Sequence, residues 1–363
     1  MSKNLWAFMP VAALLLISSS CQQGTNSGRE NNKVMGSPQA TVTTTPDTAK
    51  TPRGPLAYGL NVPPASDKDT IDVKIDVTHH LFQVSRDVAF IAWEFGGSVP
   101  GPTLKVRVGQ TVRFSMTNRS NESMNNIAMT MQGQSMHAEH AQGHRMDSAS
   151  GPMPHSIDFH AAMVNPEDKY RTVYPGETIH FTWTANYPGV FMYHCGTPMV
   201  LMHMIYGMIG MVIVEPQGGF PDKVDKEFAL VQNEFYLKKK GNTYIPDTAT
   251  ARLKQPTYVA FNGKPAQYVV NPIRVKAGER IRVYLLNAGP NNATAFHVIG
   301  TILDKVWIDG NPHNEMQGLQ SVYLGPASGA IVDFVLPEKG IYTFVDHSFA
   351  DAEMGAIGTF KAE

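Results

Sequence analysis

The residues best able to do chemistry in this sequence lie in one short stretch, residues 191–208. Cys195 is followed by His203 and then by Met208, with seven and four residues between them. A thiolate, two imidazoles and a weak axial thioether are the ligands of a blue-copper electron-transfer site. The alternative is an inert cysteine beside chance partners, because the chain has 19 methionines. Three suitable ligands in one loop favour the copper site, which then needs one further histidine.

That histidine is expected upstream, where the chain contains His155, Asp158 and His160. Side chains in a β-strand alternate between its two faces, so a strand here would point His155 one way and the other two residues the opposite way. The same alternation separates His194 from Cys195. Parity therefore places His155 with Cys195, and it places Asp158 and His160 with His194.

Two metal sites joined by one peptide bond follow from this sorting. The first is a type 1 copper site formed by His155, Cys195, His203 and Met208. The second contains His160 and His194 and has room for a third imidazole. Three histidines and one open position are typical of a catalytic metal site, where water or substrate completes the coordination shell.

The elements that must position these residues read as short β-strands. Apolar and polar residues alternate with a period of two at residues 71–77, 104–108, 111–114 and 179–183. Glycine, proline and asparagine separate these segments. The pattern predicts an all-β fold of the sandwich type.

An internal repeat indicates that the sandwich occurs twice. Residues 105–114 align without gaps to residues 274–283, and each segment continues to an asparagine, Asn118 or Asn287. Two copies of one β-sandwich are the simplest interpretation of this repeat.

The repeat also supplies a candidate for the third imidazole. Each half ends with a glycine, a short strand and a histidine, which is His194 in the first half and His347 in the second. His347 is therefore the natural third ligand of the second site. Ser348 follows it where Cys195 follows His194, so the thiolate site belongs to the first domain alone. A histidine that only fills the core is the alternative for any one of these residues.

The N-terminus, residues 1–21, reads as a secretory signal, in which Lys3 precedes the apolar residues 5–17 and small residues precede Cys21. The apolar run is too short for a stable membrane span. A cysteine here resembles a lipoprotein signal, with the mature chain anchored through a lipidated Cys21, although Ser18 stands where leucine is usual. Cleavage without lipid is the alternative. Both imply export, to the periplasm or cell envelope of a bacterium.

Composition divides the rest of the chain. Residues 22–64 are rich in Ser, Thr, Asn, Gly and Pro, which predicts a flexible tether. Residues 65–219 and 220–363 are then the two domains. Lys plus Arg (30) nearly balance Asp plus Glu (31), so there is no electrostatic case for a nucleic-acid partner.

From about residue 70 onward the sequence resembles the copper-containing nitrite reductases. The matching stretches are Pro100-Gly101-Pro102, residues 153–162, the loop from Tyr193 to Met208, Phe261-Asn262-Gly263, residues 296–300 and Val345-Asp346-His347-Ser348. Together these stretches are far more specific than any one of them.

The resemblance implies a homotrimer of chains that each contain two tandem cupredoxin-like Greek-key β-sandwiches, one type 1 copper and one type 2 copper. It implies that His160 and His194 of one chain meet His347 of a neighbour, although the residues themselves leave open whether that contact is within or between chains. The implied reaction is dissimilatory-type reduction of nitrite to nitric oxide. Its electron would come from a soluble donor, a cytochrome c or a small cupredoxin.

The resemblance also implies roles for three residues of the pocket. Asp158 would be the acid that hydrogen-bonds nitrite and relays a proton, and its parity with His160 independently places it beside the metal. His297 would be the second proton-relay residue, and Ile299 would shape the pocket. Only the resemblance singles out the last two, and a core role is the alternative for each.

One segment departs from the family pattern, because residues 124–153 are longer than usual and rich in Met and His. Thioethers and imidazoles suit copper, so our hypothesis is that this loop captures copper or guards the type 1 site. A tolerated surface insertion is the alternative.

Two other functions compete with nitrite reduction. A copper-carrier or electron-transfer cupredoxin would suit the Met/His-rich loop but would have no use for Asp158 or His297. A two-domain multicopper oxidase would need His-x-His pairs for its copper cluster, and the chain has none.

Overall fold

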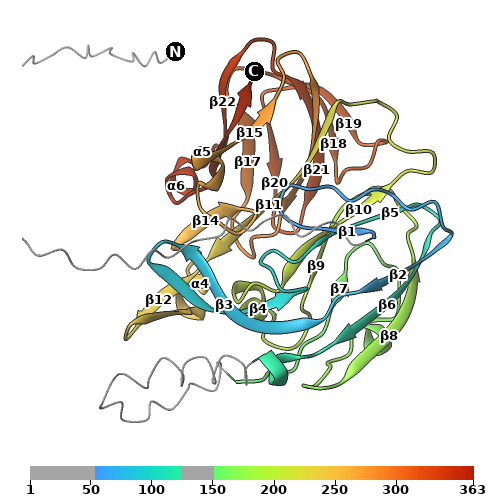
Figure 1. The fold of residues 1–363 in the computed structure, drawn as a ribbon, viewed down its shortest axis with the longest axis vertical. Coiled ribbons are helices and arrows are strands. Elements are labelled where there is room, and N and C mark those ends of the chain that lie inside the picture. The colour runs from blue at the N-terminus through green and yellow to red at the C-terminus, as the bar shows by residue number, and fades with distance from the viewer. Residues whose placement is uncertain (1–53, 124–150) are drawn as a thin grey trace, which may run out of the picture. The chain divides into compact units, whose positions relative to one another are not determined.

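The computed structural model describes residues 54–123 and 151–363, and there the strands form two successive β-sandwiches (Figure 1). No sheet in the described residues combines strands from before and after residues 216–225, which connect the two sandwiches. The predicted boundary between residues 219 and 220 lies in this connection. The predicted all-β fold with two tandem sandwiches is confirmed.

The first sandwich, domain 1, pairs two sheets around an apolar core. One sheet has the order β1-β5-β10-β9-β7: β1 Leu56–Ala57, β5 Thr103–Arg107, β10 Ile209–Glu215, β9 Gly189–His194 and β7 Asp158–Phe159. The other has the order β2-β6-β8: β2 Thr70–Lys74, β6 Thr111–Thr117 and β8 Thr178–Thr184. A hairpin of β3 (Val77–Ser85) and β4 (Val88–Phe95) and the short helices α2 (Pro166–Lys169) and α3 (Val200–Ile205) complete the domain. Alternate residues such as Val112, Phe114 and Val212 meet in the core between the sheets.

The second sandwich, domain 2, has the same plan. One sheet has the order β15-β23-β22-β17-β20: β15 Asn271–Val275, β23 Ile357–Ala362, β22 Gly340–Asp346, β17 Thr294–Val298 and β20 Ser321–Leu324. The other has the order β14-β11-β16-β21-β18-β19: β14 Tyr258–Phe261, β11 Lys226–Phe235, β16 Arg280–Asn287, β21 Gly329–Val335, β18 Leu303–Ile308 and β19 Glu315–Leu319. The remaining elements are β12 Leu237–Lys240, β13 Thr243–Pro246, α4 Thr248–Arg252, α5 Gln267–Val270 and α6 Phe349–Glu353.

The strand pairings confirm the repeat that the sequence predicted. β5 lies parallel to β10, and its counterpart β15 lies parallel to β23. β10 then pairs antiparallel with β9, as β23 does with β22. The two repeat asparagines have the same task, because each buried side-chain amide donates to two backbone carbonyls, those of Met153 and Val173 for Asn118 and those of Asn292 and Leu324 for Asn287. These two asparagines anchor equivalent loops.

Two strands are buried on both faces, because the domains pack sheet against sheet. Every residue of β10 is buried, and so is nearly all of β16. Met211 and Ile213 of β10 point away from the domain 1 core and pack with Tyr284 and Leu286 of β16. Apolar residues on both faces therefore replace the simple alternation of a half-exposed strand.

The predicted tether, residues 22–64, includes residues that belong to the folded domains. Within residues 22–64, Leu56–Ala57 form β1, which pairs antiparallel with β5, and Leu60 and Val62 pack against domain 2 and the interdomain core. Burying these apolar side chains and satisfying backbone groups at a sheet edge offsets the entropy of ordering the segment. Residues 22–53, the signal with Cys21, and residues 124–150 of the Met/His-rich loop lie outside the described residues. Among the residues described, no helix has the length and apolarity to cross a membrane.

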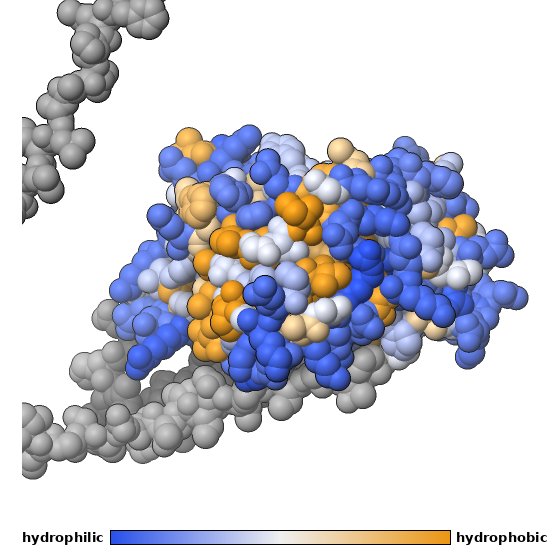
Figure 2. Space-filling model, turned by 90° about the horizontal axis from the view of Figure 1, so that it is seen from above, coloured by the Kyte–Doolittle hydropathy of each residue, from blue (hydrophilic) through white to orange (hydrophobic). Residues whose placement is uncertain are grey.

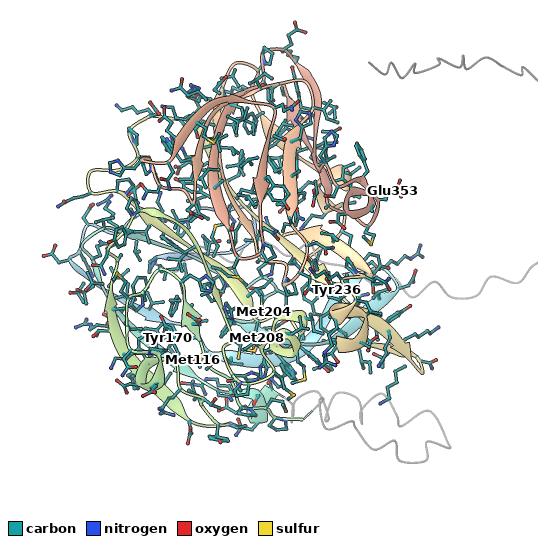
Figure 3. The ribbon with its side chains drawn as sticks, turned by 180° about the vertical axis from the view of Figure 1, so that it is seen from behind. Met116, Tyr170, Met204, Met208, Tyr236 and Glu353 are labelled. Atoms are coloured by element: carbon teal, nitrogen blue, oxygen red, sulfur yellow. The ribbon has the colours of Figure 1, made fainter. Side chains whose placement is uncertain are left out.

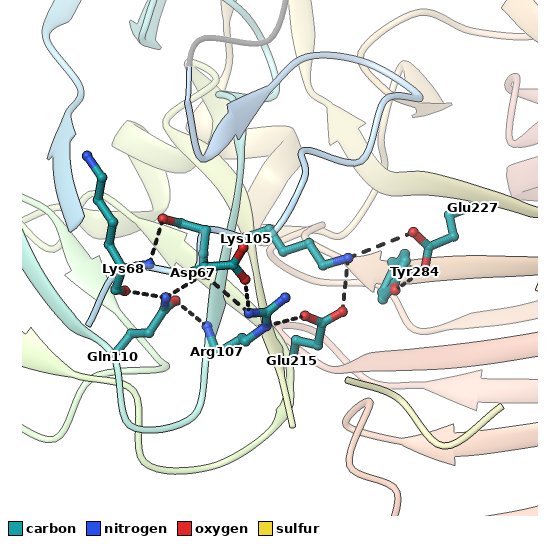
Figure 4. Close-up of polar contacts among 9 residues, drawn as sticks. Asp67, Lys68, Lys105, Arg107, Gln110, Glu215, Glu227 and Tyr284 are labelled. Atoms are coloured by element: carbon teal, nitrogen blue, oxygen red, sulfur yellow. Dashed lines mark hydrogen bonds and ion pairs between the residues drawn. The ribbon is translucent and has the colours of Figure 1, made fainter. Parts of the chain in front are cut away.

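A buried lysine links the two domains (Figure 4). The Nζ of Lys105 lies 3.3 Å from Glu215 and 3.8 Å from Glu227 of domain 2, and its side chain is 6% exposed. Arg107 also pairs with Glu215, and the Tyr284 hydroxyl donates to Glu227. Each acid therefore keeps one other partner if the lysine is lost.

We expect Lys105→Met to lower the free energy of unfolding by about 1–3 kcal/mol, the cost of leaving buried polar groups undersatisfied. The remaining partners of both acids keep the loss below the roughly 3–5 kcal/mol typical of a fully broken buried pair. Urea denaturation would measure it. Lys74→Met is the matched control, because Lys74 is 60% exposed in its pair with Asp76. Equal effects of the two substitutions would contradict the interpretation.

Candidate metal centre

The first group of potential ligands lies deep inside domain 1. The ligand atoms of His155, Cys195 and His203 all lie within 4.8 Å of one another. The Sγ of Cys195 is 3.3 Å from Nδ1 of His203, and that nitrogen is 3.2 Å from Nδ1 of His155. All three side chains are buried, with exposures of 0–1%. Their converging atoms are the Sγ and two Nδ1 atoms expected of a thiolate–imidazole site.

The segment after β9 is shaped so that its three candidate ligands converge. His203 lies in α3, and the chain then turns at Gly207, whose φ of 112° suits glycine and where a Cβ would meet Val99 at 2.6 Å. The turn brings Met208 back beside Cys195, so that its carbonyl accepts from the Cys195 N–H at 3.2 Å. Met208 is fully buried and lies next to α3 inside domain 1 (Figure 3).

Ser156 fastens the two ligand-bearing segments together. Its backbone N–H donates to the Cys195 Sγ at 3.3 Å, and its Oγ accepts from the Gly196 N–H at 3.0 Å. His155 itself is held by two backbone hydrogen bonds with Val173. An N–H aimed at the sulfur stabilises negative charge there, which favours the metal-binding thiolate.

The burial of this group keeps its imidazoles neutral. Burial, followed by the neighbouring His79 and His203, lowers the pKa of His155 well below its usual value, and burial lowers that of His203 to about 4. Burial raises the pKa of the Cys195 thiol, although the Ser156 N–H acts in the opposite direction. Neutral imidazole is the form that binds metal, and a cation would compensate the buried thiolate.

The second group lies at the surface of domain 1, on the other side of the same strand end. The ligand atoms of Asp158, His160 and His194 lie within 4.8 Å of one another. The Nε2 atoms of the two histidines are 3.0 Å apart, and Asp158 Oδ2 lies 3.9 Å from Nε2 of His194. His160 is exposed, whereas the other two residues are half-buried. This group is therefore accessible to a small ligand.

Backbone pairing sets the geometry of this second group. Asp158 of β7 lies opposite His194 of β9, and the His160 N–H donates to the carbonyl of Met192. Nδ1 of His194 lies 2.9 Å from the carbonyl oxygen of Cys195 and must carry the proton that it donates. That bond leaves Nε2 as the ligand atom, facing His160. Burial and then His194 lower the pKa of His160, while Asp158 acts in the opposite direction.

The structure places the domain 2 candidates apart from this group. Among the described residues, neither cluster of potential ligand atoms includes His347. His347 is exposed, and its ring lies 5.6 Å from that of His297 and 4.8 Å from that of Phe349. Ile299 follows β17 and is 48% exposed. His347 and Ile299 thus lie at the surface of domain 2, and His297 is half-buried beside His347.

The repeat contains a signal for His297 that sequence reasoning missed. Phe159 lies opposite the residue before His194, and Phe296 lies opposite the residue before His347. His160 and His297 each follow that phenylalanine, so they occupy equivalent positions in the two domains. Both domains thus place a pair of histidines at the same strand ends, and Phe-His in each half was the available signal.

Both groups fit copper by the chemistry of their donor atoms. A buried thiolate, two imidazoles and a nearby thioether match the soft and borderline ligands of an electron-transfer copper. Two imidazoles facing an accessible space, with a carboxylate beside them, match a site that keeps an open position. The peptide bond between His194 and Cys195 joins the two groups.

Comparison with known proteins agrees with this geometry. A family model described as multicopper oxidase matches residues 71–218. A copper-containing nitrite reductase of Neisseria gonorrhoeae is 36% identical over 315 residues, which cover 84% of this chain and 72% of that protein. The multicopper oxidase description concerns domain 1, whereas the nitrite reductase similarity extends through both domains.

Solved structures give the same result. The copper nitrite reductase of Nitrosomonas europaea matches with a TM-score of 0.68 and 32% identity, covering 81% of this chain and 94% of that one. The copper-containing nitrite reductase of Thermus scotoductus matches with a TM-score of 0.68 and 29% identity, covering 81% and 62%. The chain therefore belongs to the family of copper-containing nitrite reductases.

Proposed function

We propose that this protein reduces nitrite to nitric oxide, with one electron passing from the buried group of domain 1 to the accessible group. The observation that carries this proposal is the adjacency of Cys195 and His194. Their side chains face the two groups, and the His194 Nδ1–H donates to the Cys195 carbonyl. The dipeptide is a short covalent and hydrogen-bonded path between the groups.

The reaction consumes nitrite, one electron and two protons and yields nitric oxide and water, so one N–O bond breaks. Copper would supply one-electron exchange at His155, Cys195, His203 and Met208, as type 1 copper, and a Lewis-acid position for nitrite at His160 and His194, as type 2 copper. The protein must then hold nitrite in place and deliver the two protons to the oxygen that leaves.

Asp158 is the residue best placed to handle the first proton. Its Oδ2 lies beside the Nε2 face of His194, and the carboxylate is half-exposed. A protonated carboxyl here donates to a nitrite oxygen and is recharged from solvent. General acid catalysis of this kind contributes about 10²- to 10⁴-fold to a rate.

His297 is the candidate for the second proton. Its Nδ1–H donates to the carbonyl of Gln320, which leaves Nε2 as the nitrogen that exchanges a proton. Its equivalence to His160 in the repeat puts it at the end of β17 that faces outward with His347. Ile299, exposed on the same strand end, would limit the space beside nitrite.

A second copy of the chain would complete the accessible site. His347 is exposed and stands outside the group formed by His160 and His194 in its own chain, and Phe349 beside it is 56% exposed. Hydrophobic residues are also exposed among hydrophilic ones on the face of domain 2 seen in Figure 2. These features support association with a second copy, and the resemblance to the copper-containing nitrite reductases implies that the assembly is a homotrimer in which His347 of each chain meets the next chain.

We further propose that the protein works outside the cytoplasm. The secretory signal in residues 1–21 supports export to the periplasm or cell envelope, with anchoring if Cys21 is lipidated. A soluble cytochrome c or small cupredoxin would deliver the electron.

The test is nitric oxide formation from nitrite, without oxygen, by copper-loaded protein supplied with a reduced artificial donor. We expect nitric oxide from the wild-type protein and at least about a 10³-fold loss in His160→Ala, since a residue of a catalytic unit is removed. His180→Ala is the matched control, because His180 is an exposed histidine of β8.

If His160→Ala formed nitric oxide at the wild-type rate, the reaction would not occur at the group that contains His160 and His194. No nitric oxide from protein shown to hold copper at both sites would refute nitrite reduction and favour a copper-carrier or electron-transfer role.

A further inference from the structure

A third buried histidine, which the proposed reaction does not use, contacts the type 1 ligand set. Nε2 of His79 lies 2.8 Å from Nε2 of His155, although the two residues are 76 positions apart. The His79 side chain has no exposed surface, and neither does that of His155. The contact is therefore shielded from water and cannot be exchanged for a hydrogen bond to solvent.

The chemistry of the two rings determines the direction of this hydrogen bond. Nδ1 of His155 faces His203 and is the ligand atom, so a metal-bound His155 carries its proton on Nε2. His155 Nε2–H must then donate, and His79 Nε2 must accept.

The surroundings of His79 hold its ring in place beside His155. Its backbone N–H donates to Ser123 Oγ at 2.9 Å, and it lies opposite Trp93 in the β3–β4 hairpin. The two rings stack with centroids 5.3 Å apart and an angle of 18°, while His155 meets His79 edge-on at 77°. Trp93 also lies against His203, at 5.0 Å. The hairpin thus presents one rigid acceptor to the copper ligand.

We propose that His79 is a positioning residue of the type 1 site, which accepts the His155 Nε2–H and thereby sets both the orientation and the donor strength of that ligand. This proposal rests on the proposed function only in taking His155 and Cys195 as copper ligands. An acceptor on the outer nitrogen makes an imidazole a stronger electron donor. A stronger donor stabilises the oxidised metal, so His79 lowers the reduction potential of the site.

The test compares His79→Leu with His79→Gln in copper-loaded, full-length protein. Leucine removes the acceptor, whereas glutamine can place Oε1 near the position of Nε2. The readouts are the reduction potential of the thiolate-bound copper, its visible and paramagnetic resonance spectra, and copper loss to a chelator. His80→Gln is the matched control, since His80 points to the other face and pairs with Glu94.

We expect His79→Leu to raise the reduction potential of the type 1 copper. A tenfold change in the equilibrium constant for reduction would correspond to about 59 mV for one electron. Copper affinity should fall about 10- to 100-fold, as for other ligand-supporting residues. His79→Gln and His80→Gln should keep potentials near that of the wild type. A merely space-filling His79 would predict the reverse order, because leucine fills an apolar site better than glutamine.

Equal potentials in all three variants, or equal shifts in the leucine and glutamine variants, would overturn the proposal. Potentials that follow this order would support it even in a protein that forms no nitric oxide. If the wild-type protein lacked thiolate-bound copper, both the type 1 assignment and this role of His79 would be wrong.

Discussion

Replacing Cys195 by alanine is expected to abolish the intense visible absorption of the copper-loaded protein and to leave copper at the second site. The absorption of a type 1 site depends on its thiolate, and Cys195 supplies the sulfur of the buried group. His160 and His194 belong to the other group, and β7–β9 pairing positions them independently of the sulfur. Turnover with a donor should fall to background, a loss of more than about 10³-fold, as for other members of a catalytic unit.

Visible and paramagnetic resonance spectra, with metal analysis, would measure this effect. Ser348→Ala is the matched control, because Ser348 occupies in domain 2 the position that Cys195 occupies in domain 1. The control should keep the full absorption. Strong absorption in Cys195→Ala, or loss of copper from both sites, would show that the two groups are not the separate centres described above.

The second large effect is expected from Asp158→Asn, which should keep both coppers while lowering kcat about 10²- to 10⁴-fold, the usual contribution of a general acid. Asparagine has nearly the same shape as aspartate, but its amide cannot deliver a proton from Oδ2. Oδ2 of Asp158 lies 3.9 Å from the His194 Nε2, beside the position proposed for nitrite.

Initial rates across a pH series, with copper content determined for each sample, would test this prediction. Asp72→Asn is a suitable control, since Asp72 is an exposed carboxylate of domain 1 that pairs with Arg113. Its kcat should equal that of the wild type. If Asp158→Asn kept the wild-type kcat at every pH, Asp158 would not be the proton donor.

Two features of the fold depend on contacts between distant segments and could not be predicted from local patterns in the sequence. The alternation of apolar residues predicted the strands of the core, but it does not tell whether a strand is covered on one face or on two. β10 and β16 are covered on both because the domains pack sheet against sheet. Leu56–Ala57 lie in a segment whose composition predicts a tether, and only pairing with the edge of β5 makes them a strand.

The sequence by itself determined which residues belong to which metal group. Cys195, His203 and Met208 are close in the chain, and the two-residue period of a strand must separate His194 from Cys195. The tertiary structure alone decided which nitrogen of His194 and of His155 faces the other potential ligands, because the remaining nitrogen contacts the Cys195 carbonyl or His79. It also decided that His79 matters at all. Contacts between residues 76 positions apart arise from packing, and no local pattern in the sequence encodes them.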